Sequence, residues 1–173
     1  VYSEGKFTLG EFARIFAMKS FTTAIRNTLI LGTVTGICAV LIGFLFAYVD
    51  AYVNTGSRIM KGLFSVISIL PVVSPPFVLS LSAIMLFGRT GVITRGVFNL
   101  STTALYGLPG IALVQTLTFF PVCYLMLKGL LRNIDPSLEE AARNMGASRW
   151  KVFTSVTLPL LAPGLGNAFL VTF

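Results

Sequence analysis

Residues 135–159 are DPSLEEAARNMGASRWKVFTSVTLP, a polar stretch that lies between two long apolar runs. Asp135-Pro136 is a strong helix start, because an aspartate accepts hydrogen bonds from the free amides of the first turn and proline at the first helical position loses none. Gly146 supplies the left-handed residue that ends such a helix, and Ser148 can cap the next one. The stretch therefore predicts a helix of about ten residues, a glycine turn and a second helix that runs into the apolar segment.

The first of these helices has a narrow apolar stripe at positions i, i+3, i+4 and i+7, formed by Leu138, Ala141, Ala142 and Met145. Its charged residues Glu139, Glu140 and Arg143 lie off that stripe. So short a helix is marginal in water, and its two alanines let another backbone approach closely, which favours a groove on a partner. The alternative is a solvated surface helix with an ion pair between Glu139 and Arg143.

The rest of the chain is apolar, with 55% hydrophobic and 11% charged residues. Four runs carry no charge: Asn27–Val49, Gly62–Gly88, Gly96–Leu127 and Val152–Phe173. A helix needs about 20 residues to cross a bilayer, so each run is long enough to span. We expect an all-α polytopic bundle in one domain, 1–173, with spans at about 27–49, 62–87, 108–127 and 156–173, and a polar loop at 128–155.

The chain begins at Val1 without a start methionine and is still apolar where it ends at Phe173, so we expect a fragment with a truncated fourth span. If the loop 128–155 is cytoplasmic, the inner segments hold seven Lys and Arg residues and the outer segments hold six. The positive-inside rule favours this orientation only narrowly. The segment from Thr8 to Ser20 alternates apolar and charged residues, as in an amphipathic helix on the outer surface.

Prolines interrupt the second expected span about nine residues after its start, close to the expected midplane. A broken helix at that depth is tolerated where protein or a water-filled cavity receives the freed carbonyls, so this region is a candidate for the lining of a pathway. A kink that only shapes packing is the alternative. Gln115 in the third span is a further candidate, because an amide in mid-membrane must find partners. The candidate pathway residues are Pro71, Ser74, Pro75, Pro76 and Gln115.

The spacing within 140–159 resembles the E-A-A, three residues, G, nine residues, I-x-L-P signature of the membrane subunits of binding-protein-dependent ABC importers, with Val156 in place of isoleucine. The resemblance implies the type I importer permease (MetI-like) fold. It assigns Glu140 and Gly146 to a helix that couples to the ATPase, and Ala141 and Ala142 to its contact face. Leu158-Pro159 becomes the junction with the next span.

The same resemblance implies a multi-pass protein of the bacterial inner membrane. Its implied partners are a cytoplasmic ABC ATPase subunit, a periplasmic or extracellular solute-binding protein, a second permease half or subunit, and membrane lipid. The chain has no Gly-rich phosphate loop, so we expect no enzyme activity in it and ATP hydrolysis by another subunit. With no histidine and no ligand cluster we expect no metal site and no cofactor, and we find no pattern for nucleic acid.

Two shorter motifs bear on the transported solute. Ser74-Pro75-Pro76-Phe77 and the stretch 87–94, FGRTGVIT, resemble the ferric-iron group of these permeases. Thiamine, 2-aminoethylphosphonate and polyamine permeases share much of the pattern and stay open as alternatives. A secondary transporter or channel is a remoter alternative, which would predict charged residues inside the spans; the four runs carry none.

Overall fold

The computed structural model describes residues 2–3, 6–7, 10–52, 62, 66, 68–69, 71, 74–97 and 106–173. A small antiparallel hairpin comes first, and every later element is helical. The elements are β1 (Tyr2–Ser3), β2 (Lys6–Phe7), α1 (Gly10–Ala17), α2 (Lys19–Tyr52), α4 (Pro76–Phe87), α5 (Val92–Gly96), α6 (Leu108–Arg132), α7 (Pro136–Asn144), α8 (Arg149–Val152), the π-helix η1 (Phe153–Thr157) and α9 (Leu158–Thr172). The expected all-α class is confirmed.

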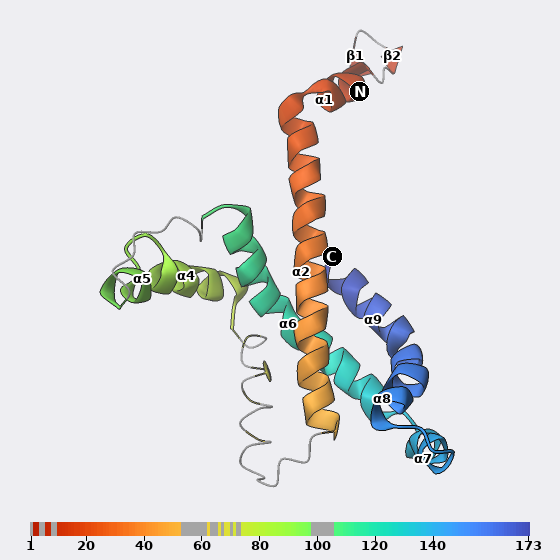
Figure 1. Cartoon of the computed structure of the whole chain (residues 1–173). Helices are drawn as coiled ribbons and strands as arrows, with labels where there is room; N and C mark the ends of the chain where they lie inside the picture. Colours follow the sequence, from red (N-terminus) through yellow and green to blue (C-terminus); the bar gives the residue numbers. More distant parts are fainter. Residues whose placement is uncertain are drawn as a thin grey trace.

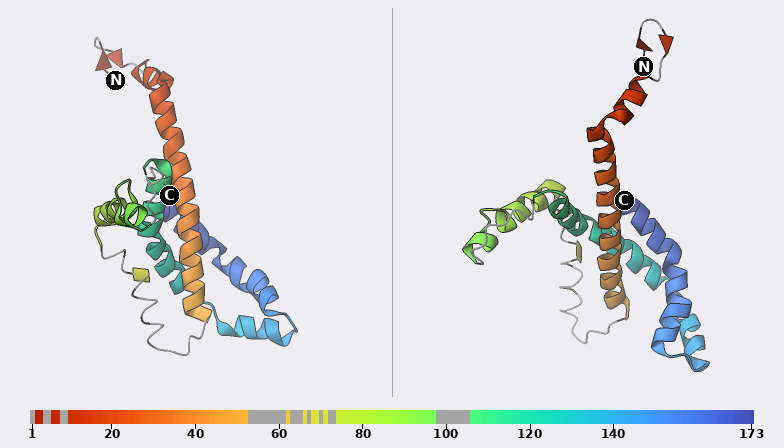
Figure 2. Two further views of the ribbon diagram at one scale, coloured as in Figure 1. Left: turned by 60° about the vertical axis from the view of Figure 1, so that its left-hand side comes forward. Right: turned by 45° about the horizontal axis from the view of Figure 1, so that its top comes forward.

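The centre of the fold is the long helix α2, which α6 crosses and against which α9 packs (Figures 1 and 2). The core formed by these three helices contains Ala39, Ala47, Phe120, Cys123, Tyr124, Leu127, Leu131, Leu161 and Ala168. Small residues on α2 permit the close crossing. Ala39, Gly43 and Ala47 are all buried and stand four residues apart, so they form one face of the helix.

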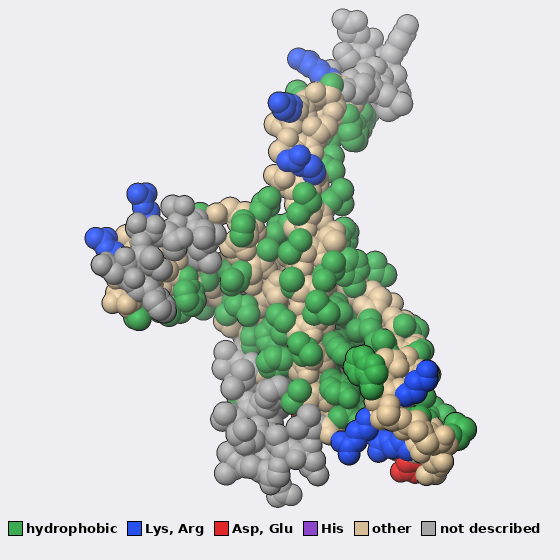
Figure 3. Space-filling model, in the orientation of Figure 1, with side chains coloured by type: hydrophobic (Ala, Val, Ile, Leu, Met, Phe, Trp, Pro, Cys, Tyr) green, Lys and Arg blue, Asp and Glu red, His purple; other side chains and the backbone are tan. Residues whose placement is uncertain are grey.

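Side chains are sorted along the long axis of the molecule. Hydrophobic side chains cover the middle of α2 and the helices beside it, while Lys and Arg side chains gather at the two ends and around α5 (Figure 3). Four helical segments are long and apolar enough to cross a membrane: Lys19–Tyr52, Phe77–Gly96, Leu108–Arg132 and Arg149–Thr172. This sorting fits a chain whose middle lies in hydrocarbon and whose ends lie in water.

The helices differ in extent from the expected spans. The first and third contain the expected 27–49 and 108–127 and run beyond them, because charged residues at a helix end can reach water or pair with one another. For the second, the described residues contain the candidate segment Phe77–Gly96, which overlaps the expected 62–87. Most of 53–73 falls outside the described residues, so that part of the expectation stays untested.

Helix α4 begins at the prolines. Ser74 lies in a bend, Pro75 has an extended backbone with φ −56° and ψ 138°, and Pro76 opens the helix. The expected break in the helix is therefore present. It lies at the start of the candidate segment Phe77–Gly96, and its expected place in the middle of a longer span stays a prediction, because most of 53–73 falls outside the described residues. Together α4 and α5 project from the side of the three-helix core (Figures 1 and 2).

The stretch 87–94 forms the tight turn between α4 and α5. A Cβ added at Gly88 would lie 2.3 Å from the carbonyl oxygen of Ile84, and one added at Gly91 would lie 2.4 Å from that of Leu86. The hydroxyl of Thr94 donates to the carbonyl oxygen of Gly88 at 2.6 Å and closes the turn. The two glycines and the threonine of this motif are thus explained by the local fold.

Candidate coupling site

Helix α7 and the turn after it form as the sequence predicts. The Asp135 carboxylate accepts a hydrogen bond from the backbone N–H of Ser137 at 2.9 Å, and Pro136 opens the helix. This N-terminal hydrogen bond lowers the pKa of Asp135, because it favours the charged carboxylate. Gly146 has φ +84°, which is the left-handed conformation expected for the end of a helix. Ser148 then caps α8 by accepting from the N–H of Lys151 at 3.3 Å.

A buried glutamate ties α7 to the rest of the chain. The side chain of Glu139 accepts hydrogen bonds at Oε1 from the hydroxyls of Tyr52 and Thr157, the latter at 2.9 Å. Its Oε2 lies 3.7 Å from the Arg143 guanidinium one turn further along α7. Tyr52 is the last residue of α2, and Thr157 is the last residue of η1. One carboxylate therefore joins three elements, and we call Tyr52, Glu139 and Thr157 the Glu139 junction.

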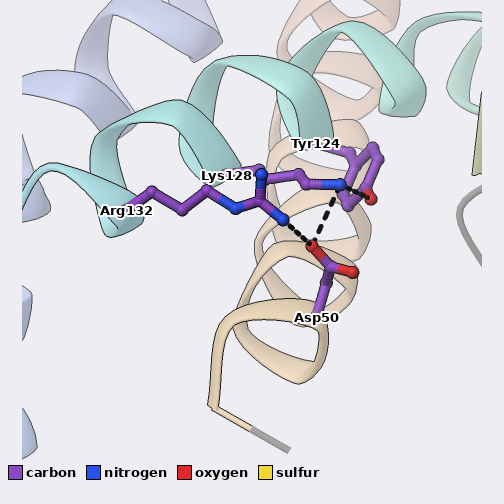
Figure 4. A network of polar contacts seen from close by, with 4 residues as sticks. All are labelled: Asp50, Tyr124, Lys128 and Arg132. Carbon is purple, nitrogen blue, oxygen red and sulfur yellow. Dashed lines mark hydrogen bonds and ion pairs between the residues drawn. The ribbon is translucent and has the colours of Figure 1, made fainter. Parts of the chain in front are cut away.

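A second charged cluster holds α2 against α6 at the same end of the molecule (Figure 4). The Asp50 side chain, 8% exposed, has its Oδ2 3.0 Å from Nζ of Lys128 and 3.5 Å from the Arg132 guanidinium. Lys128 also donates a hydrogen bond to the hydroxyl of Tyr124 at 2.8 Å. Because a buried charge needs partners, this cluster fixes the end of α2 relative to α6. The Glu139 junction then builds on that fixed end.

A cavity of about 370 Å³ opens beside the Glu139 junction. Its lining combines the ends of α2 and α7 with α8 and η1, and consists of Tyr48, Tyr52, Glu139, Arg143, Arg149, Val152, Phe153 and Thr157. The aromatic rings of Tyr48 and Tyr52 stack with centroids 4.8 Å apart, and Phe153 meets Tyr48 edge-on. This cavity separates part of α7 from α2 and η1. The side chain of Glu139 bridges the separation by its hydrogen bonds to Tyr52 and Thr157.

Some of the residues expected on the contact face of α7 are exposed, and one is buried against the rest of the chain. Glu140 and Ala141 are exposed, as are Leu138 at 47% and Met145 at 82%. Ala142, in contrast, is only 7% exposed and lies on the same side of α7 as the buried Glu139. Its expected place on the contact face stays a prediction. Leu158 and Pro159 are exposed in the first turn of α9, directly after the π-helix.

Sequence reasoning missed the Glu139 junction. It placed Glu139 on the solvent side, because it ranked positions by hydrophobicity alone. Nothing in the local sequence marks Tyr52 as the third member, because it is 87 residues from Glu139.

The candidate pathway residues lie in two places. Pro71 and Ser74 are half-buried and Pro75 is exposed, all before α4, while Pro76 is the first residue of that helix. Gln115 lies on α6, where its Oε1 accepts a hydrogen bond from the hydroxyl of Thr35 on α2 at 3.3 Å. The amide therefore has the partner that its position in the membrane requires, and this partner joins α2 to α6.

The sequence matches a known protein family. The family described as "Binding-protein-dependent transport system inner membrane component" matches residues 39–173. The ferric transport system permease protein FbpB of Actinobacillus pleuropneumoniae is 34% identical over 99% of this chain and 25% of its own length. The molybdenum transport system permease protein ModB of Escherichia coli K12 is 34% identical over 61% of this chain and 46% of its own length. The chain thus spans about a quarter of the length of the ferric relative.

Solved structures share the fold. A bacterial ABC transporter involved in the import of the acidic polysaccharide alginate superposes with a TM-score of 0.80. That match covers 98% of this chain and 62% of the other at 20% identity. A second structure of an alginate ABC transporter, in complex with a periplasmic protein that binds an alginate pentasaccharide, superposes with a TM-score of 0.81 at 20% identity and covers 96% of this chain and 60% of the other. Identity at this level supports the arrangement of helices and says nothing about the solute.

Proposed function

This chain belongs to the family of binding-protein-dependent transport system inner membrane components, and we propose that it is part of the permease subunit of an ATP-driven importer in which α7 contacts the ATPase. The observation that carries the proposal is the geometry of α7. The helix presents Glu140 and Ala141 outward, and Met145 directly after it is also exposed, while Glu139 fastens its other side to Tyr52 at the end of α2 and to Thr157 immediately before α9. A short exposed helix that is hydrogen-bonded to membrane helices can bind another subunit and pass that subunit's movement to those helices.

The partners follow from this role. We propose a separate cytoplasmic ABC ATPase on the exposed side of α7, a solute-binding protein on the opposite face of the membrane, and a second permease half or subunit. The alginate transporter that shares this fold was solved with a periplasmic binding protein, which supports the second partner. The chain itself would bind and guide solute by alternating access, without a covalent step.

Docking on α7 can be tested in the full-length permease. Ala141→Trp would place a large side chain on the exposed face of α7, and Ser155→Trp would place one at an exposed position of η1 outside the proposed contact. We expect Ala141→Trp to abolish co-purification of the ATPase and Ser155→Trp to preserve it. Unchanged co-purification with the α7 variant would show that the ATPase binds elsewhere.

For the solute we propose ferric iron delivered by a binding protein. The relative named as a ferric transport permease covers 99% of this chain and supports that choice. The stretch 87–94 adds little, because its glycines and Thr94 are explained by the turn between α4 and α5. Molybdenum, as an oxyanion, is the second candidate, favoured by the molybdenum transport relative over 61% of the chain.

Uptake by a strain that lacks the permease separates these candidates. Radiolabelled ferric iron and radiolabelled molybdate are supplied separately, with and without the full-length gene restored. We expect the gene to restore iron uptake and leave molybdate uptake unchanged. Restoration of molybdate uptake alone would transfer the assignment to molybdenum, and restoration of neither would reject both solutes.

A further inference from the structure

The Glu139 junction joins the end of one candidate span to a point inside another. Tyr52 closes α2, and Thr157 stands immediately before α9, within the candidate span Arg149–Thr172. Both hydroxyls donate to the same carboxylate oxygen, while the other oxygen faces Arg143 within α7. Glu139 is only 9% exposed, so its buried carboxylate needs these hydrogen-bond partners, and such bonds are directional.

The covalent route from α7 to α2 and α9 is much less direct, although only residues 133–135 separate α7 from α6. Between α7 and η1 the chain passes through the left-handed Gly146 and the short helix α8. Between α7 and the end of α2 it passes through about half of the chain, since Tyr52 and Glu139 are 87 residues apart in a chain of 173. The Glu139 carboxylate therefore offers a direct side-chain route by which a displacement of α7 reaches the end of α2 and the residue before α9.

We propose that Glu139 is a positioning residue that transmits movement of α7 to α2 and α9 through Tyr52 and Thr157, and that these two hydroxyls determine how much solute is moved per ATP. The inference rests on the proposed function of α7 as the ATPase contact. It assigns the transmission to residues outside that contact, on the inner side of the helix. The exposed face receives the ATPase, and the buried carboxylate passes the movement on.

Three variants isolate the hydroxyl of Thr157. Thr157→Val keeps the shape of the side chain and removes its donor to Glu139, whereas Thr157→Ser keeps the donor. Thr154→Val is the matched control in the same π-helix, because the hydroxyl of Thr154 bonds only to backbone carbonyls of its own helical segment, those of Trp150 and Lys151. Tyr52→Phe removes the other donor from a different helix and provides an independent test.

The experiment uses the full-length permease with its ATPase and binding protein in proteoliposomes, and measures radiolabelled ferric iron imported per ATP hydrolysed. If the uptake assay assigns molybdate, that ion replaces iron. We expect the ratio to fall about tenfold in Thr157→Val and in Tyr52→Phe, the change expected for losing one hydrogen bond to a charged group. We expect Thr157→Ser and Thr154→Val to stay within about twofold of the unaltered protein, and ATPase co-purification to be unchanged throughout.

Several results would overturn the inference. A normal ratio in Thr157→Val and Tyr52→Phe would show that the hydroxyls are not needed for transmission. An equal loss in Thr157→Ser or Thr154→Val would trace the effect to packing of the π-helix. Loss of ATPase co-purification in both Thr157→Val and Tyr52→Phe would make the junction a folding or docking element. Failure of the unaltered protein to bind the ATPase or to import solute would instead reject the proposed function.

Discussion

Gly43 sets how closely α2 approaches α6, and a single methyl group there tests the packing of the core. A Cβ added at Gly43 would lie 2.6 Å from Cβ of Cys123, 2.8 Å from the backbone nitrogen of Tyr124 and 2.9 Å from the carbonyl oxygen of Phe120. Carbon atoms pack at about 3.5–4.0 Å, so Gly43→Ala requires the two helices to move apart by about 1 Å. Two of the three obstacles are backbone atoms, which cannot rotate away.

The magnitude follows from two opposing effects. Overpacking of this kind costs about 1–3 kcal/mol, and the rigid obstacles place Gly43→Ala in the upper part of that range. Alanine stabilises a helix relative to glycine by about 1 kcal/mol, which offsets part of the cost. We therefore expect the free energy of unfolding to fall by about 1–2 kcal/mol. Gly129→Ala in α6 is the matched control, because a Cβ there meets nothing within 4 Å and only the gain in helix propensity remains.

The assay is thermal unfolding of the purified full-length permease in detergent, followed by the reaction of a thiol dye with the buried Cys123 in a background without other cysteines. The midpoint temperature should fall for Gly43→Ala and stay the same or rise for Gly129→Ala. A midpoint for Gly43→Ala equal to or above that of the unaltered protein would refute the close crossing of α2 and α6. A parallel fall in both variants would show that the substitution acts through the helix alone.

Three further predictions concern orientation, the turn after α7 and the buried ion pair. A single cysteine at Arg143 should resist an impermeant thiol reagent until the cells are opened, whereas one at Arg89 should react from outside. Gly146→Val should abolish stimulation of the ATPase by loaded binding protein, because a β-branched residue is strongly disfavoured at φ +84°. Asp50→Asn should destabilise the permease by about 3–5 kcal/mol in thermal unfolding, because it leaves Lys128 without its carboxylate, and adding Lys128→Met should recover part of the loss.

Each of these has a result that would contradict it. Labelling of position 143 in intact cells would reverse the orientation. Full stimulation of the ATPase in the glycine variant, with normal assembly, would remove the turn from the coupling route. A double variant at Asp50 and Lys128 that is less stable than Asp50→Asn alone would show that the lysine stabilises the fold without its acid.

The local structure around α7 could be predicted because its signals are short-range. Asp135, Pro136, Gly146 and Ser148 each act on the backbone within a few residues, and each occupies the conformation expected from its own chemistry. The direction in which α7 faces could not be predicted in this way. It depends on a hydrogen bond from Tyr52, a residue distant in sequence, and an apolar stripe carries no information about such a partner.

The helices α2 and α6 are longer than their charge-free runs, and at the end of α2 the cause is again a contact between residues distant in sequence. A charge-free run stops at the first charged residue, but Asp50 stays helical because Lys128 and Arg132 on α6 neutralise it. Within the second expected span the prolines act locally: Pro75 adopts an extended backbone, and α4 begins after it. The extent of that span stays a prediction, because most of 53–73 falls outside the described residues.

The length of α2 has a consequence for how the chain stands in the bilayer. Its 34 residues extend about 51 Å, whereas the hydrocarbon core is about 30 Å thick. To fit the whole helix within the hydrocarbon core, its axis would have to tilt by about 54° from the bilayer normal, which is beyond the 0–40° observed for membrane helices. At 40° about 26 residues suffice, so about eight must stand clear of the hydrocarbon. Counted from Tyr52, these are the residues from Lys19 to Arg26, which carry a cation at each end and lead directly into α1 and the β-hairpin.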